Sequence, residues 1–244
     1  MNILNEIAEK TKERIRINKN FDFEKSLTKN KINFICEVKK ASPSKGVICE
    51  DFDPVKIAEE YEQAGAAAIS VLTEPFYFQG SDQYLQDISK IVKIPLLRKD
   101  FIVNESMIYE AKFLNASAVL LICAILDDNQ LSSYIKIAEN IGLSALIETH
   151  DETEIKRALD CGAKIVGVNN RDLKTFEVDI KTSERLKKYI PDDKIFVSES
   201  GIQTRGDVKR LEEIGVNAIL IGETLMRSKN KAYELKRLRG DIKS

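Results

Sequence analysis

The sequence is poor in the residues that build metal centres, because His150 is its only histidine and its four cysteines form no CxxC pair. Zinc sites need a cluster of Cys and His ligands, so we expect no metal ion and no cofactor. Cys36 and Cys123 lie inside apolar runs, and Cys49 and Cys161 stand alone. This usage is typical of reduced thiols in or near the core of a protein in a reducing compartment.

Long apolar runs and excess charge are also missing. The longest apolar run, around Ala118–Leu126, is far too short to cross a bilayer. The first 18 residues alternate charged and apolar side chains and lack the apolar core of a signal peptide. A net charge of −1 generates no overall field for nucleic acid or an anionic membrane. We therefore expect a cytoplasmic protein with a small-molecule substrate and neither of those partners.

No Gly/Ser-rich or Pro-rich linker divides the 244 residues, so we expect one domain over residues 1–244. Four segments, beginning at Gln63, Phe113, Asp160 and Glu213, repeat one pattern. In each, a charged segment is followed by Gly or Asn and then by an apolar run, which is typical of a helix ended by a left-handed residue before a buried strand. Helices that alternate with such strands imply a parallel sheet with right-handed crossovers.

Eight strands and eight helices in alternation are the number required for a closed α/β barrel of the TIM, or (β/α)₈, type, and the alternative is an open doubly wound sheet. An extra helix is expected at Asn2–Ile17, within a lead-in of residues 1–32. The expected strands are Asn33–Lys39, Ala67–Thr73, Pro95–Lys99, Ala118–Ala124, Ser144–Glu148, Lys164–Asn169, Lys194–Glu199 and Ala218–Gly222. The expected helices include Pro54–Ala64, Glu105–Leu114, Asp127–Ile141, Asp151–Leu159, Lys181–Tyr189, Thr204–Ile214 and Leu225–Leu238.

Polar side chains end several of the apolar strands. Glu37 and Lys39 are two residues apart, so they lie on one face of the first strand, while Cys36 and Val38 face the other way. Because unpaired buried charge is costly, this pair either lines a polar cavity or forms an internal ion pair. Later strands end in Lys99, Glu148, Asn169, Glu199 and Ser200, with Arg171 two residues after Asn169. Barrel enzymes build their active sites at these strand ends, and converging lysines and carboxylates suit acid–base chemistry.

Two glycines, Gly201 and Gly222, follow the seventh and eighth strands, where barrels often bind phosphate. Lys39 and Ser42 are placed to complete such a site, although ordinary turn glycines are the alternative. Aromatic residues follow two strands, at Phe76–Phe78 and at Phe101. They are either core residues or the wall of a pocket for an aromatic substrate.

These residues lie in segments that resemble the indole-3-glycerol phosphate synthase family. The matching segments, between residues 35 and 228 and in family order, are CEVKKASPSKG, ISVLTEPFYFQGS, LLRKDFIVNESMIYEA, VLLICAIL, IETHDETEI, GVNNRDLKTFEVD, VSESGI and NAILIGETLMRS. The resemblance implies a carboxy-lyase of tryptophan biosynthesis without metal or cofactor. Its substrate would be 1-(2-carboxyphenylamino)-1-deoxyribulose 5-phosphate, which is cyclised, decarboxylated and dehydrated to indole-3-glycerol phosphate.

The resemblance also implies roles for individual residues. Lys99 matches the general acid at the substrate carbonyl, and Glu148 matches its acid–base partner. Glu223 departs from members that carry serine there, so we expect its backbone N–H rather than its carboxylate to face phosphate. Matching active-site positions are Glu37, Lys39, Asn169, Arg171, Glu199 and Ser200. Matching phosphate contacts are Lys39, Ser42, Gly201, Gly222 and Glu223, and the aromatic-ring pocket matches Phe78, Phe101, Leu120 and Leu173.

Three other functions compete with this one. An isomerase acting on a related sugar phosphate would need a cysteine and an aspartate facing each other, but Cys36 faces away from Lys39 and Asp100 adjoins Lys99. An aldolase would use Lys99 or Lys39 as a Schiff-base nucleophile. A barrel that only binds its ligand would have lost matched catalytic residues, and none is missing. We expect the protein to be a monomer.

Overall fold

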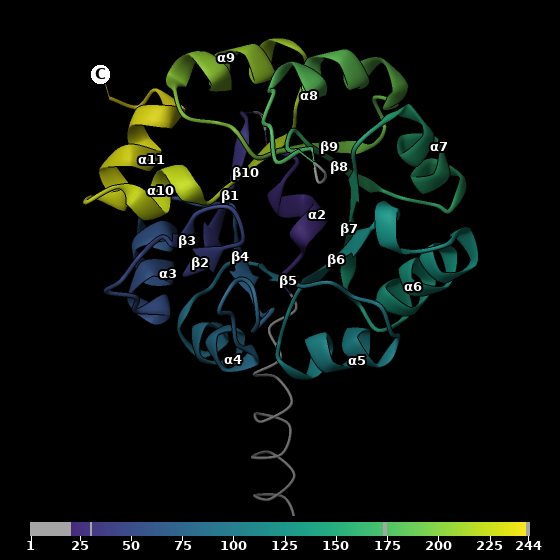
Figure 1. Ribbon diagram of the computed structural model, residues 1–244, viewed down its shortest axis with the longest axis horizontal. Coiled ribbons are helices and arrows are strands. Elements are labelled where there is room, and N and C mark those ends of the chain that lie inside the picture. The colour runs from purple at the N-terminus through teal and green to yellow at the C-terminus, as the bar shows by residue number, and fades with distance from the viewer. Residues whose placement is uncertain (1–20, 30, 173–174, 243–244) are drawn as a thin grey trace, which may run out of the picture.

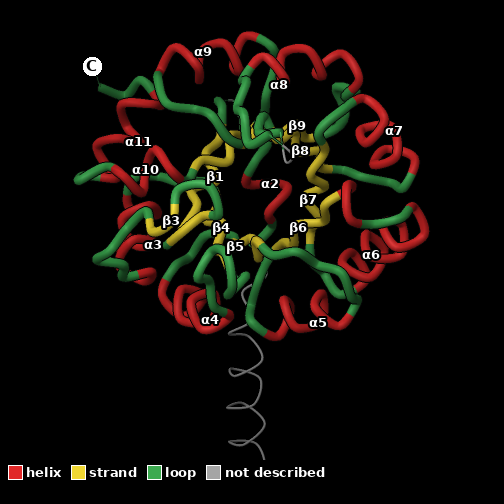
Figure 2. The backbone as a smooth tube through the Cα atoms, in the orientation of Figure 1, coloured by secondary structure: helices red, strands yellow, loops and turns green. Residues whose placement is uncertain are grey.

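The strands form one closed barrel in the computed structural model, which describes residues 21–29, 31–172 and 175–242. All neighbouring strands of the barrel are parallel, in the order β1-β10-β9-β8-β7-β6-β5-β4. Figures 1 and 2 show the ring of strands inside a ring of helices. The strands are β1 Asn33–Val38, β4 Ala68–Leu72, β5 Leu96–Lys99, β6 Ala118–Ile122, β7 Ser144–Thr149, β8 Ile165–Asn169, β9 Ile195–Glu199 and β10 Ala218–Ile221. The predicted barrel is confirmed and the open sheet is excluded, while the predicted helix Asn2–Ile17 lies outside the described residues.

A helix covers each crossover between strands. Asp53 caps α3 by accepting a hydrogen bond from the Lys56 backbone N–H, and Pro54 occupies the first turn as predicted. A short hairpin of β2 (Ala41–Ser42) and β3 (Gly46–Val47) follows β1 and was not predicted. The helices are α3 Pro54–Gln63, α4 Asp82–Ile91, α5 Ser106–Phe113, α6 Asp128–Asn140, α7 Glu152–Asp160, α8 Lys181–Leu186, α9 Arg205–Glu213, α10 Glu223–Arg227 and α11 Lys231–Arg239, with short 3₁₀ turns η1 Cys123–Ile125 and η2 Lys187–Tyr189.

The prediction of a single helix over Leu225–Leu238 is wrong, because the segment forms α10 and α11. Ser228 has extended backbone (φ −72°, ψ 135°) and ends α10. Asn230 then caps α11, its side chain accepting a hydrogen bond from the Tyr233 backbone N–H at 2.9 Å. Asparagine favours such caps over helix interiors because its side chain competes for backbone hydrogen bonds.

The repeated Gly or Asn before buried strands is explained by backbone conformation. Gly65, Asn115, Gly162 and Gly215 all have φ between +65° and +98°. This left-handed conformation ends each helix and directs the chain back to the sheet. The prediction from the four repeated segments is therefore confirmed.

Apolar side chains form two cores, one between strands and helices and one inside the barrel. The inner core is closed at the strands' N-terminal end by α2 (Phe23–Ser26), whose Phe23 is fully buried together with Leu27. Figure 1 shows α2 within the ring of strands. Asn33 ties this plug to β1 by donating to the Leu27 carbonyl at 2.9 Å. The opposite end of the barrel is free to hold a cavity. None of the helices in the described part of the chain is long and apolar enough to cross a membrane.

Candidate active site

A cavity of about 640 Å³ opens at the C-terminal ends of the barrel strands. Its lining includes every site residue expected from the sequence except Leu173, which lies outside the described residues. The expected residues that line it are Glu37, Lys39, Ser42, Phe78, Lys99, Phe101, Leu120, Glu148, Asn169, Arg171, Glu199, Ser200, Gly201, Gly222 and Glu223. Parallel strands thus bring together side chains that are up to 186 positions apart in sequence, from Glu37 to Glu223.

Lys99 lies between two carboxylates at the floor of this cavity. Its Nζ donates to Glu148 Oε2 and to Glu199 Oε2, both at 3.0 Å. Burial alone disfavours the ammonium, but the charges of Glu148, Glu199 and Glu37 outweigh it and raise the pKa of Lys99 well above its usual range. The lysine is therefore a fixed cation at neutral pH.

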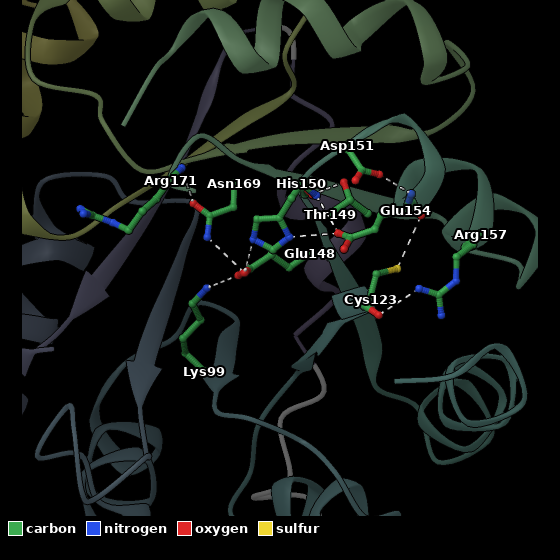
Figure 3. A network of polar contacts seen from close by, with 11 residues as sticks. Lys99, Cys123, Glu148, Thr149, His150, Asp151, Glu154, Arg157, Asn169 and Arg171 are labelled. Carbon is green, nitrogen blue, oxygen red and sulfur yellow. Dashed lines mark hydrogen bonds and ion pairs between the residues drawn. The ribbon is translucent and has the colours of Figure 1, made fainter. Parts of the chain in front are cut away.

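Glu148 is surrounded by hydrogen-bond donors. Besides Lys99, its Oε1 accepts a hydrogen bond from Asn169 Nδ2 at 3.1 Å and lies 3.4 Å from His150 Nε2 (Figure 3). Burial raises the pKa of this carboxyl, but Lys99, His150 and Asn169 together hold the pKa well below its usual range. Glu148 is therefore an ionised carboxylate in the free protein.

Glu199 is the other acid on Lys99, and its environment is less favourable to charge. It is 1% exposed, and its Oε1 has no hydrogen-bond partner among the described residues. Burial, supplemented by the charges of Glu148 and Glu37, raises the pKa of Glu199 to about 7 against the opposing effect of Lys99. The two acids on one lysine thus differ in their tendency to hold a proton.

Gly167, a residue that sequence analysis did not select, makes room for Glu199. A Cβ at this position of β8 would overlap the Glu199 Oε1 atom and press on Leu146. The signal was a glycine in the interior of an otherwise apolar strand, which often marks close approach by another group. Gly222 has a similar function, since a Cβ there would overlap the Glu37 carboxylate. Glu37 in turn forms an ion pair with Lys39 at 2.6 Å, on the shared face expected from their spacing.

The turn after β9 has an unusual backbone. Ser200 and Gly201 both have positive φ, at 68° and 84°. Asn170, which sequence analysis also missed, holds this turn by donating to the Ser200 carbonyl and to Ser198 Oγ, both at 3.0 Å. Its Oδ1 accepts hydrogen bonds from the backbone and hydroxyl of Ser183, at 3.0 and 2.8 Å, at the start of α8. The second asparagine of the NNRDL segment was its only sequence signal.

Glu223 pairs its side chain with an arginine of its own helix. Its Oε1 accepts a hydrogen bond from Arg227 Nε at 3.0 Å, one helical turn along α10. Gly222 stands at the start of α10, and Thr224 Oγ1 donates to the Ile202 carbonyl at 2.7 Å. The carboxylate of Glu223 is therefore neutralised along the helix.

Phe78 and Phe101 line the cavity where the chain leaves β4 and β5, and in the strand order β5 lies opposite β9. Their ring centroids are 6.1 Å apart. Glu74 fixes the loop by accepting backbone hydrogen bonds from Phe76, Tyr77 and Phe78 at 2.8–3.0 Å. The sequence left open whether these aromatic residues lie in the core. Phe76 and Tyr77 are mostly exposed, so these two residues are not core residues.

The cysteines are all free, with Cys36 and Cys123 buried. Cys36 faces the outer core with Val38, away from Lys39. Across the described ranges, no group of three or more His, Cys, Asp or Glu side chains is arranged to hold a metal ion. What the cavity offers is a lysine between two acids, a second lysine–glutamate pair, and an aromatic wall.

The fold and the cavity together define a (β/α)₈ barrel that holds a lysine between two glutamates at the carboxyl ends of its strands. A family model described as indole-3-glycerol phosphate synthase matches residues 3–238. The chain belongs to the indole-3-glycerol phosphate synthase family, whose members are carboxy-lyases of tryptophan biosynthesis.

Relatives in this family cover most of the chain. The indole-3-glycerol phosphate synthase of Ruminiclostridium cellulolyticum is 59% identical over 220 residues, which are 90% of this chain and 85% of the relative. That of Endomicrobium trichonymphae is 57% identical, covering 91% and 86%. That of Leuconostoc mesenteroides is 48% identical, covering 93% and 87%.

Solved structures with little sequence identity share the fold. A 3-hexulose-6-phosphate synthase superposes with a TM-score of 0.69 at 13% identity, covering 87% of this chain and all of that one. A chain of the tryptophan synthase complex of Pyrococcus furiosus superposes with a TM-score of 0.63 at 14% identity, covering 85% and 98%. At this level of identity the likeness shows the barrel fold alone.

Proposed function

We propose that this enzyme converts 1-(2-carboxyphenylamino)-1-deoxyribulose 5-phosphate into indole-3-glycerol phosphate, with release of carbon dioxide and water. The observation that carries the proposal is Lys99 Nζ, held 3.0 Å from both Glu148 and Glu199 on the floor of the cavity. Membership of the family supports the overall reaction. The assignment of residues to individual steps follows what the family resemblance implies and is supported by the geometry of the cavity.

The substrate would lie across the barrel mouth. Its phosphate would bind at the turn of Ser200 and Gly201 and at the Gly222 end of α10, where backbone N–H groups suit an anion, with Lys39 and Ser42 adjacent. Its carboxyphenyl ring would pack against Phe78, Phe101 and Leu120. Arg171 also lines the cavity and suits an anionic substrate group.

Ring closure would place the substrate's carbonyl oxygen at Lys99. The aryl carbon that bears the carboxylate attacks the carbonyl carbon, and Lys99 gives a proton to the oxygen as negative charge develops there. The bond to the carboxylate then breaks, its electron pair restores the aromatic ring, and carbon dioxide leaves. A fixed ammonium stabilises this transition state, while two carboxylates restrain proton release.

Glu199 would relieve that restraint. Its pKa of about 7 allows it to carry a proton near neutral pH, which removes one negative charge from Lys99. Lys99 is then a stronger acid towards the substrate oxygen. We assign the active form as ionised Glu148, protonated Glu199 and charged Lys99.

Dehydration completes the indole. The new hydroxyl leaves as water after gaining a proton, and a base removes a proton from the neighbouring carbon. Glu148 is the acid–base partner assigned here, and the Glu37–Lys39 pair borders the same part of the cavity. Asn169 orients Glu148 through its 3.1 Å hydrogen bond. One chain supplies every group, so a monomer suffices, and free thiols suit a cytoplasmic enzyme.

Incubating the protein with the substrate tests this function directly. We expect indole fluorescence to rise with release of one carbon dioxide per product formed. Absence of product from folded protein would contradict the proposal. Borohydride reduction in the presence of a ketose phosphate tests the aldolase alternative, and we expect no mass increase on Lys99 or Lys39.

A further inference from the structure

We propose that His150 is a positioning residue, whose imidazolium is held by Glu154 against Glu148 and keeps Glu148 ionised while Glu199 carries the proton. The proposal rests on the function proposed above, because it assigns the two acids on Lys99 to different protonation states. His150 is the first residue after β7, and in the sequence it was of interest only as a potential metal ligand.

His150 is held on two sides by acids (Figure 3). Its Nδ1 lies 3.0 Å from Glu154 Oε2, and its backbone N–H donates to the same oxygen at 2.8 Å. Glu154 is fixed in turn at the start of α7, where its backbone N–H donates to Asp151 Oδ1 at 2.9 Å. The ring therefore has one orientation, with Nε2 directed at Glu148.

The contact with Glu148 is ionic. His150 Nε2 lies 3.4 Å from Glu148 Oε1, is buried, and has no hydrogen bond to any described residue. A buried ring nitrogen beside a carboxylate is stable when it carries a proton and the charge pairs with the acid.

Acidic groups outnumber basic groups around the imidazole ring of His150. Glu148 on β7 and Glu154 on α7 face it directly, with Asp151 behind Glu154, while Lys99 on β5 lies beyond Glu148. Burial opposes the imidazolium, but Glu148 and Glu154 outweigh it and raise the pKa of His150 to about 10. By reciprocity, the imidazolium lowers the pKa of Glu148.

The consequence is an asymmetry between two acids that share one lysine. Glu148 faces Lys99, Asn169 and His150, whereas the Glu199 carboxylate has Lys99 alone as its hydrogen-bond donor within the described chain. Because His150 is outside the cavity lining, it acts through Glu148 and does not touch substrate. Together with Asn169, His150 thus favours ionisation of Glu148 over ionisation of Glu199.

Nuclear magnetic resonance tests the ion pair without turnover. As the only histidine, His150 gives a single imidazole signal in protein without a histidine tag. We expect this signal to stay in the protonated form from pH 6 to pH 9, and its pKa to fall by about one unit or more in Glu148→Gln. A wild-type signal that titrates near pH 6.5 would overturn the proposal.

The pH dependence of activity tests the consequence. In His150→Gln the pKa of Glu148 rises, so the acidic limb of kcat/KM should move up by about one pH unit, while KM changes less than about threefold. Glu154→Gln should move the acidic limb of kcat/KM in the same direction but by less than one pH unit. His150→Arg should return the acidic limb to its wild-type position. Glu152→Gln, an exposed acid in the same turn of α7, is the matched control and should leave the profile unchanged.

A His150→Gln profile that superimposes on that of wild type would also overturn the proposal. If wild-type protein formed no indole product, the proposed function would fail, yet the resonance experiment would still report on the His150–Glu148 pair. The two failures are therefore distinguishable.

Discussion

The two ends of the barrel are built from the same eight strands but filled by opposite kinds of side chain. At the N-terminal end, Phe23 and Leu27 close an apolar interior. Asn33 donates a hydrogen bond to the Leu27 carbonyl there. At the C-terminal end, Glu148 and Glu199 are buried around one lysine. Burial of apolar surface stabilises the first end, whereas buried charge costs free energy at the second. The comparison predicts that substitutions at the plugged end act mainly on stability and that substitutions at the charged end act mainly on activity.

Removal of Lys99 should have the largest effect on activity. Lys99→Ala loses both the proton donor and the charge that stabilises the oxyanion, so kcat should fall by about 10⁴-fold or more, with substrate still bound through phosphate and ring. Lys99→Arg should recover little, because a guanidinium has a pKa above about 12 and donates a proton poorly. Steady-state kinetics measure both variants. High activity in Lys99→Arg would contradict the proton-donor role and would mean that the positive charge alone is required.

Glu148→Gln should slow catalysis by roughly 10²–10⁴-fold, the usual range for an acid–base group. The amide keeps the shape and the hydrogen bond from Asn169 but loses charge and basicity. Circular dichroism should show an unchanged fold. Near-normal turnover would reduce Glu148 to a structural partner of Lys99.

Phe23→Ala tests the plugged end, and should lower the free energy of unfolding by about 3–5 kcal/mol. The lost ring leaves a cavity in the inner core, while kcat of the folded fraction stays near that of wild type. Phe113→Ala is the matched control, since Phe113 is 78% exposed and its loss should change stability little. Denaturant unfolding and kinetics at low temperature measure both. If Phe23→Ala lowered kcat but left the free energy of unfolding unchanged, the separation of stability and activity between the two ends of the barrel would be contradicted.

Glu199→Gln tests whether buried charge is costly at the active end. Burial raises the folded-state pKa of Glu199 from 4.5 to about 7, so its contribution to stability is complete below pH 4.5 and is lost as pH rises through 7. Above pH 7 the neutral amide should therefore stabilise the protein relative to wild type, by up to about 3 kcal/mol. Unfolding at pH 5 and pH 8 measures the change. An equal difference at both values would contradict the raised pKa.

Lys39→Ala should have the smallest effect, raising KM about tenfold and lowering kcat less. Its ammonium pairs with Glu37 and borders the proposed phosphate site. Crystals soaked in sulfate should show the anion at the Gly201 and Gly222 turns in wild type. Sulfate bound only elsewhere would remove the physical basis for this assignment.

Local sequence patterns determined the order of strands and helices, because left-handed Gly or Asn residues, helix caps and apolar runs act over a few residues. They also placed Lys99, Glu148, Asn169 and Glu199 at strand ends, and closure of the barrel then put these ends around one cavity. The break between α10 and α11 was missed although no apolar residue lies between Met226 and Ala232 and Asn230 is a residue that favours helix caps.

The contacts between these charged side chains could be seen only in the folded structure. Lys99 meets partners 49 and 100 residues away, and no local pattern specifies that both acids share its ammonium. Gly167 matters because Glu199 comes from the neighbouring strand, and His150 matters because α7 brings Glu154 to its far side. Local residue patterns thus account for a barrel with charged strand ends. The protonation of these groups depends on burial and on distances of a few ångströms between distant chain segments, because electrostatic interactions depend on both.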